Sequence, residues 1–114
     1  MMNSREMAKI AVQALEDKKG IDIRVIDITS VSVIADYFII ATGANKSQVQ
    51  AMVDNVEEEM FKNGVEAKQI EGYSTANWIL LDYSDIIVHV FSSEDRLFYD
   101  LERIWKDGKI IEEL

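Results

Sequence analysis

An unbroken apolar segment, residues 37–41 (Tyr-Phe-Ile-Ile-Ala), lies in the first half of the chain. Its residue types are those of a β-strand, and none of its positions is polar enough to prefer water. A strand of this kind is typically buried on both faces, with a neighbouring strand on either side. We therefore expect residues 37–41 to form a central strand in a sheet that is covered on both faces.

Three segments have the spacing of amphipathic helices. The first spans residues 4–18, with Asn3 as its cap and Gly20 at its end. The second begins near Ser47, where Gln50 would complete a capping box, and ends at Asn63-Gly64. The third follows a cap at Ser92 or Ser93 and stops at Gly108. The three apolar stripes are, in order, Met7, Ile10, Ala11, Ala14 and Leu15; Val49, Met52, Val53, Val56 and Met60; and Leu97, Leu101, Ile104 and Trp105.

Strand patterns fill the remaining segments. Residues 21–28 alternate between apolar and polar positions, which predicts a half-buried strand. Residues 67–71 form a short strand, and residues 78–82 and 86–91 form a hairpin around Tyr83-Ser84-Asp85. The predicted order is αββαβββα, an α/β (α+β) fold with a mixed five-stranded sheet and helices packed on it. Residues 1–114 make a single domain, and residues 109–114 are expected to be a flexible tail.

Composition narrows the function classes. The chain has 114 residues, no cysteine and 48% hydrophobic residues, which excludes disulfides, thiolate metal sites and a disordered chain. Its N-terminus lacks the apolar core of a signal peptide, and no apolar run approaches a membrane span, so we expect a cytoplasmic protein. The net charge of −9 disfavours nucleic acid as the primary ligand. It would attract a basic protein partner, although on charge alone a role in solubility is the more common explanation.

Three candidate chemical sites each have a structural explanation. The loop at Gly43-Ala44-Asn45 could hold an anion, but it lacks the full phosphate-loop pattern. His89 is the only histidine and shares a strand face with Ile87 and Phe91, which favours a structural role over that of a general base. Asp82 and Asp85 could hold a divalent metal, but across a tight turn they more often bind their own backbone. We therefore predict no catalytic residue, metal or cofactor.

Aromatic and arginine residues near the end of the chain point to a binding surface. Trp78 opens a strand beside a polar loop, where an exposed anchor is more expected than a core tryptophan. Tyr99 lies off the apolar stripe of the last predicted helix, and Arg96 precedes it by three residues. Trp, Tyr and Arg dominate interface energetics. Ordinary core packing explains the same composition about equally well.

The residues of four segments together resemble the ribosomal silencing factor family, also called Iojap or RsfS. The segments are residues 36–43, Glu71-Gly72, residues 78–91 with the pattern W-x-x-x-D-x-x-D-x-x-x-H-V-F, and residues 96–102 with Trp105. The resemblance extends from the first helix to Trp105. Ser84 departs from the family pattern, which usually has glycine at this position of the turn, so the turn type is an open question.

The resemblance implies a function as well as a fold. It implies a fold akin to nucleotidyltransferases without their catalytic acids, and binding to the fourteenth protein of the large ribosomal subunit, a basic protein at the intersubunit face. Occupying that face would block joining of the small subunit and repress translation. The partner-contacting residues carried over by motif are Trp78, Leu81, Asp82, Tyr83, Arg96 and Tyr99. Family members also pair as homodimers, so a homodimer is expected here.

Two alternatives stay open on the sequence alone. One is a divergent metal-dependent nucleotidyltransferase that uses Asp82 and Asp85, although these acids are one residue too far apart for the usual D-x-D pattern. The other is a homodimeric adaptor that never meets the ribosome. Sedimentation with isolated large subunits separates the three possibilities.

Overall fold

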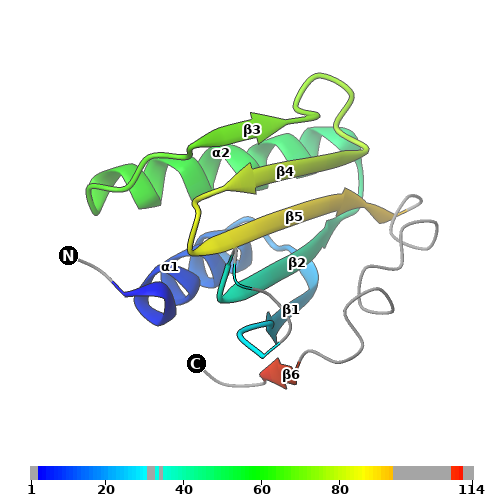
Figure 1. The fold of residues 1–114 in the computed structure, drawn as a ribbon. Helices are drawn as coiled ribbons and strands as arrows, with labels where there is room; N and C mark the ends of the chain where they lie inside the picture. The colour runs from blue at the N-terminus through cyan, green and yellow to red at the C-terminus, as the bar shows by residue number, and fades with distance from the viewer. Residues whose placement is uncertain (1–2, 31–32, 34, 94–108, 112–114) are drawn as a thin grey trace.

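The computed structural model describes residues 3–30, 33, 35–93 and 109–111. These residues form a single α/β domain in which two helices pack against one mixed sheet (Figure 1). The predicted third helix, including Arg96 and Tyr99, lies outside the described residues. The elements are α1 (Ser4–Asp17), β1 (Ile21–Asp27), β2 (Tyr37–Gly43), α2 (Lys46–Lys62), β3 (Gln69–Glu71), β4 (Trp78–Asp82), β5 (Ile86–Ser92) and β6 (Lys109–Ile111).

The sheet has the order β3-β4-β5-β2-β1-β6. Strand β2 is buried along its whole length and lies near the middle, as its apolar sequence predicts. It pairs in parallel with β5, while all other neighbours are antiparallel, so the predicted mixed sheet is confirmed. The strand that follows α2 does not pair with β2; it runs to the sheet edge, and the β4–β5 hairpin brings the chain back to the centre (Figure 1).

A sixth strand adds to the five that were predicted. Residues 109–111, which we expected to belong to a flexible tail, pair with β1 as strand β6. The segment is three residues long and has only two apolar positions, too short for a periodic pattern to identify it. Its pairing depends on the open edge of β1, whose paired residues are 82–86 positions away in sequence, and local patterns do not reveal such a partner.

Strand β1 follows the predicted half-buried alternation at Ile23, Arg24 and Val25, but its end is buried on both faces. Val25 lies on the helix side and Ile26 on the other side of the sheet, and both are buried. At its start the strand is irregular: its register with β2 shifts between Ile21 and Arg24, and Asp22 has a positive φ of 49°. Ile21 is consequently exposed instead of joining the core face.

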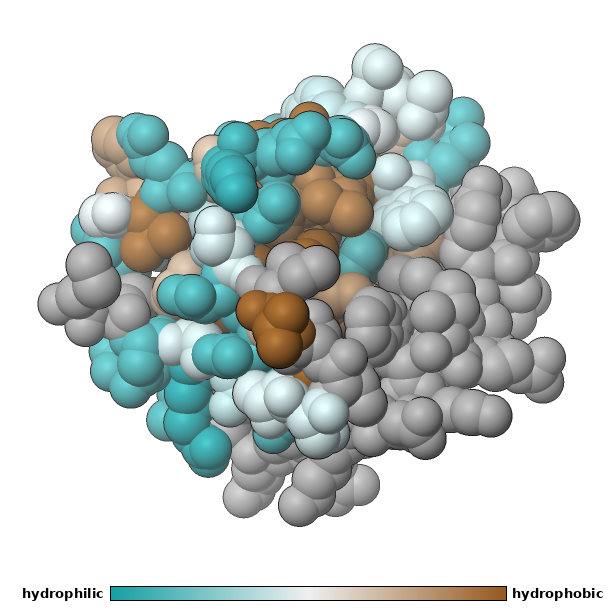
Figure 2. Space-filling view, in the orientation of Figure 1, coloured by the Kyte–Doolittle hydropathy of each residue, from teal (hydrophilic) through white to brown (hydrophobic). Residues whose placement is uncertain are grey.

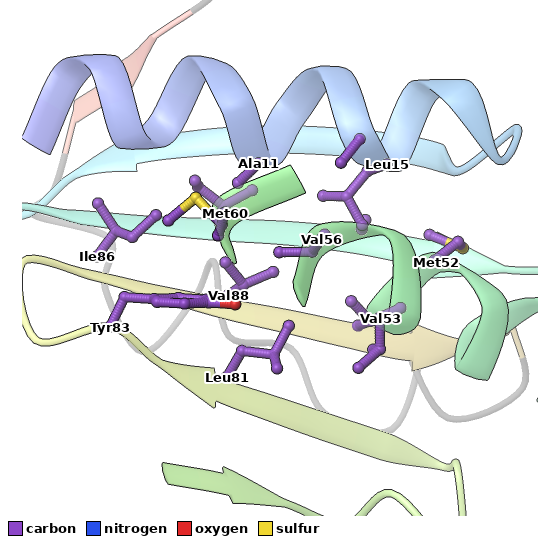
Figure 3. Packing of buried hydrophobic residues seen from close by; sticks show 14 of the residues in the cluster. Ala11, Leu15, Met52, Val53, Val56, Met60, Leu81, Tyr83, Ile86 and Val88 are labelled. Carbon is purple, nitrogen blue, oxygen red and sulfur yellow. The ribbon is translucent and has the colours of Figure 1, made fainter. Parts of the chain in front are cut away.

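The main core lies between the sheet and the two helices, which cover the same face (Figure 1). Figure 3 shows side chains of α1 and α2 interlocking above those of β4 and β5. Predicted apolar stripes of both helices point into this core: Met7, Ala11, Ala14, Leu15, Val49, Met52, Val53, Val56 and Met60 are all buried. Burial of apolar surface stabilises a fold by about 25 cal/mol per Å², so this packing is the main source of stability.

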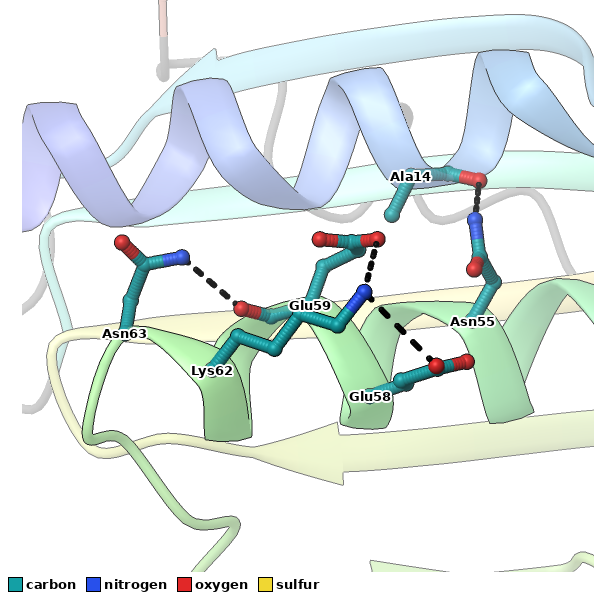
Figure 4. A network of polar contacts seen from close by, with 6 residues as sticks. All are labelled: Ala14, Asn55, Glu58, Glu59, Lys62 and Asn63. Atoms are coloured by element: carbon teal, nitrogen blue, oxygen red, sulfur yellow. Dashed lines mark hydrogen bonds and ion pairs between the residues drawn. The ribbon is translucent and has the colours of Figure 1, made fainter.

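The two helices are also tied by polar contacts. Asn55 of α2 donates from Nδ2 to the carbonyl of Ala14 on α1 at 2.8 Å, in a partly buried position (Figure 4). Lys62 pairs with Glu58 at 3.7 Å and with Glu59 at 3.3 Å on the exposed side of α2. Exposed pairs of this kind contribute little, about 0.2–1 kcal/mol. Because both ion pairs lie within α2, the Asn55–Ala14 hydrogen bond is the contact of this group that joins the two helices.

The helix ends agree only partly with the predicted caps. Asn3 caps α1, accepting the amide of Glu6 at 2.8 Å, as predicted. Asn45, and not Ser47, caps α2 and accepts the amide of Gln48 at 2.8 Å. Asn has the same capping chemistry as Ser, so the choice between two neighbouring candidates depends on the backbone and not on residue type.

Gln48 links the start of α2 to the end of α1. Its side-chain oxygen accepts the amide of Ala44 at 2.6 Å, and its Nε2 donates to the carbonyls of Lys18 and Lys19 at 3.0 Å each. Helix ends leave such carbonyls without intrahelical partners, and a side-chain donor satisfies them. Gln48 thus caps both helices at once. No helix in the described part of the chain has the length and apolar composition to cross a membrane.

Candidate partner-binding surface

Strand β4 sends alternate side chains to opposite faces of the sheet, as predicted. Ile79 and Leu81 lie on the helix side and are completely buried, whereas Trp78, Leu80 and Asp82 lie on the other side and are only half-buried. A strand with period two must divide its side chains in this way. The candidate surface is therefore the face of β4 that points away from the helices.

This geometry corrects two of the six residues predicted to contact a partner. Leu81 is 0% exposed and Tyr83 is 5% exposed, and both belong to the core beneath α2 (Figure 3). Neither lies on the face that carries Trp78, so neither can belong to a contact surface centred on Trp78. Residues of the family motif that maintain the fold cannot be told from contact residues by the motif alone, and burial identifies these two as part of the fold.

Trp78 is held in place by His89 on the neighbouring strand. Its indole Nε1 donates a hydrogen bond to His89 Nδ1 at 3.0 Å. The register pairs Trp78 with Phe91 and Leu80 with His89, so the two rings are diagonal neighbours on one face. Trp78 is therefore not the fully solvent-facing anchor that the sequence suggested, but a half-buried ring with a fixed polar end.

The rings around this pair form a compact aromatic cluster. Trp78 stacks on Phe91 with ring centroids 5.3 Å apart, and Phe38 meets His89 edge-on at 4.7 Å. Ile26, Ile28, Ala35 and Ile40 complete this second core, against which Trp78 and Ile87 are partly buried. Aromatic pairs at these distances add about 0.5–1.5 kcal/mol beyond burial. The cluster pre-organises the Trp78 ring before any partner arrives.

His89 is neutral in this setting. Burial lowers the pKa of His89 to about 4, because charging the ring would cost solvation energy. Since Nδ1 accepts from Trp78, the proton resides on Nε2, and Nε2 is buried with no hydrogen-bond partner among the described residues. The structural role predicted for His89 is therefore that of a hydrogen-bond acceptor that orients Trp78. The hairpin register implied by Tyr83-Ser84-Asp85 could have revealed this pairing.

Asp82 has a role in the hairpin turn. Its Oδ1 accepts the amide of Ser84 at 2.8 Å, the local backbone bond expected of an aspartate at a tight turn. Ser84 has a positive φ of 70°. Glycine adopts this conformation without strain, which is the physical reason to expect glycine at this position of the turn. The turn keeps the glycine-type conformation although the residue is serine.

The surface around Trp78 combines apolar area with negative charge. Leu80 and Ile87 are half-buried on the same face, and the register places Glu71 beside Leu80 and Asp82 beside Ile87. Figure 2 shows hydrophobic surface over β4 and β5 next to hydrophilic surface. An apolar centre with a charged rim is the usual anatomy of a protein interface.

The loop considered as an anion site is occupied by the protein itself. The Ala44 amide is bound by the Gln48 side chain, and the Asn45 side chain caps α2. A Cβ atom on Gly43 would lie 2.8 Å from the Val49 side chain, so this glycine permits close packing of the loop on α2. The loop therefore serves the connection between β2 and α2.

Comparison with known proteins gives consistent matches over nearly the whole chain. The family model described as "Ribosomal silencing factor during starvation" matches residues 1–114. The chain is 38% identical over 109 residues to the ribosomal silencing factor RsfS of Bacillus subtilis, covering 96% of this chain and 92% of that protein. It is 31% identical over 104 residues to the chloroplastic protein Iojap of Zea mays, covering 88% of this chain and 43% of that protein.

Two solved structures share the fold. A crystal structure of a protein from Chromobacterium violaceum has a TM-score of 0.90 and 35% identity, covering 92% of this chain and 88% of that one. A crystal structure from Bacillus halodurans has a TM-score of 0.86 and 34% identity, covering 96% and 99% respectively.

Proposed function

Because the chain belongs to the ribosomal silencing factor family, we propose that it represses translation by binding the large ribosomal subunit. It docks through a basic ribosomal protein at the intersubunit face and thereby blocks joining of the small subunit. The family match over residues 1–114 carries this proposal. The protein then acts in the cytoplasm with the ribosomes, and without a cofactor.

The surface around Trp78 is the docking surface in this proposal. A half-buried tryptophan that is already oriented by His89 loses little side-chain freedom on binding, which favours affinity. The acidic side chains Glu71 and Asp82 and the net charge of −9 attract a basic partner and speed encounter. We assign contacts to Trp78 and Asp82 on β4, and to Arg96 and Tyr99 beyond the described residues.

Sedimentation with purified large subunits tests the proposal. The protein should travel with large subunits at low salt, should be released as salt increases, and should lower the yield of joined ribosomes when small subunits are added. The Trp78→Ala variant should lose capture, whereas Phe61→Ala, which removes an exposed aromatic side chain on the helix side, should keep it.

The other outcomes separate the alternatives. Wild-type protein that stays at the top of the gradient at low salt contradicts a silencing role. If it then migrates as a dimer, the homodimeric adaptor replaces the proposal. Capture without any effect on subunit joining would retain ribosome binding and reject the blocking mechanism.

A further inference from the structure

A groove on the helix side of the sheet lies opposite the face that carries Trp78. It has a volume of about 440 Å³ and is bordered by the second half of α2, the following loop and β3. Its lining is apolar with an acidic contribution: Phe61, Val65, Ala67, Ile70, Tyr83, Glu57, Glu58 and Glu66. This composition differs from the closed aliphatic core beside it.

Two large apolar side chains of the groove are exposed to an unusual degree. Phe61 is 64% exposed and Ile70 is 37% exposed. Exposed apolar side chains that cluster around a hollow mark interaction sites more often than scattered ones do.

The Tyr83 hydroxyl supplies an independent indication of a ligand. The side chain lines the groove and is only 5% exposed, and its hydroxyl has no hydrogen-bond partner among the described residues. Burial, and then the charge of Glu57, raise the pKa of Tyr83 above its ordinary value, so the group keeps its proton as a hydrogen-bond donor. A buried hydroxyl without a partner is costly, and a ligand that bonds it removes that cost.

Strand β3 contributes a free backbone edge to the same region. It is the first strand in the sheet order, so only one of its sides pairs with a described strand, and all three of its residues are exposed. Ile70 is opposite Leu81 in the register, which places its side chain on the helix side, at the groove. A peptide strand added to β3 would send every second side chain toward this groove.

We propose that the groove and the outer edge of β3 bind an extended segment of a basic protein in which Lys or Arg alternates with apolar residues. The aliphatic stem of the basic residue packs on Phe61 and Ile70, and its charge meets Glu57 and Glu66. Lys62 already pairs with Glu58 and Glu59, so those carboxylates are the less available ones. A second copy of this chain, with net charge −9 and its own acidic groove, would be repelled.

A labelled hexapeptide with alternating Lys and Val is the probe, and fluorescence anisotropy measures its affinity. Phe61→Ala and the Glu57→Gln, Glu66→Gln double variant should each weaken binding at least five-fold. The matched control is Glu16→Gln with Asp17→Asn at the exposed end of α1, which removes the same charge and should change affinity less than two-fold. Equal weakening in both double variants would reduce the binding to diffuse charge attraction and overturn the proposal.

Tyr83→Phe and amide measurements locate the site. Tyr83→Phe should weaken the peptide several-fold without lowering the unfolding midpoint, because it removes a hydroxyl that is unsatisfied in the free protein. Bound peptide should slow amide exchange at Gln69–Glu71. Peptide-induced changes confined to the Trp78 face, or dimerisation through the groove without peptide, would reject the proposal. Trp78→Ala should bind the peptide normally, so the result is independent of ribosome capture.

Discussion

On the helix side of the sheet, β4 and β5 present Ile79, Leu81, Val88 and Val90, all completely buried under α2 and α1. On the opposite side the same strands present the buried rings of His89 and Phe91 together with the half-buried side chains of Trp78, Leu80 and Ile87. Aliphatic side chains have no polar atoms, so they fill a core without needing hydrogen-bond partners. Aromatic side chains with polar ends hold a fixed shape at a surface. The helix-side face of these two strands is therefore wholly core, whereas the opposite face combines a small second core with half-buried side chains at the surface.

The largest expected effect is the loss of stability when a buried side chain of the helix-side face is shortened. Leu81→Ala should lower the free energy of unfolding by about 2–5 kcal/mol, since it leaves a cavity among fully buried side chains. Leu80→Ala, one position along on the other face and half-buried, should cost less than half as much. Urea titrations of both variants measure the difference. Similar losses for the two would mean that the faces are energetically equivalent.

Acid should lower the stability of the protein through protonation of His89, which lies on the other face. The pKa of His89 is about 4 in the folded protein and about 6.5 in the unfolded chain, so between these values the unfolded state binds more protons. Stability is therefore fully retained above pH 6.5 and falls as pH decreases toward 4. The loss from this one group should reach about 2 kcal/mol at pH 5.

The His89→Gln variant is the control for the acid effect. The variant should be less stable than wild type at pH 7 but should lose less stability between pH 7 and pH 5. The carboxylates titrate in both proteins, so the difference between the two losses reports the contribution of His89. Parallel pH profiles for the two proteins would show that His89 is accessible to protons in the folded state.

Trp78 should show effects on both stability and binding. Truncation to alanine should cost on the order of 2 kcal/mol or more of binding to large subunits, the size of an interface hot spot. It should also cost about 1–3 kcal/mol of stability, because His89 Nδ1 loses its donor and Phe91 loses its stacking partner. Binding measured per folded molecule separates the two effects. Retained binding per folded molecule would restrict Trp78 to a structural role.

Trp78→Phe sharpens the same comparison. It keeps an aromatic ring for stacking on Phe91 but removes the indole N–H together with part of the ring area. A variant that folds well but binds poorly would assign the part of the indole beyond a single ring, including its nitrogen, to recognition.

Local patterns predicted most of the fold. The apolar run of β2, the stripes of both described helices and the alternation in β4 are confirmed, because each depends on a repeat within one segment. Strand β6 was missed because it depends on a distant edge. The family resemblance is also confirmed, since its motif extends over many positions.

The candidate site was harder to predict than the fold. The family motif assigned Leu81 and Tyr83 to the same surface as Trp78, although the structure places them on the opposite face of the sheet. The sequence also predicted a solvent-exposed Trp78, because the hydrogen bond to His89 depends on the register between two strands and is not visible in either strand alone. Groups that meet across a hairpin are visible only once the turn fixes that register.

The smallest expected effect lies in the turn that fixes this register. Ser84 has a φ of 70°, and a side chain there costs about 1 kcal/mol that glycine avoids. Glycine also gives the unfolded chain more freedom, which offsets part of the gain. Ser84→Gly should therefore stabilise the protein by about 0.5 kcal/mol. The Asp82 hydrogen bond to the residue 84 amide persists in the variant, so a gain reports backbone strain alone. Thermal unfolding of Ser84→Gly beside Ser84→Ala measures it: alanine keeps the Cβ and should give no gain. If both variants raise the midpoint equally, the serine hydroxyl and not backbone strain destabilises the wild-type turn. The positive φ at residue 84 would then carry no measurable cost for a residue with a Cβ atom.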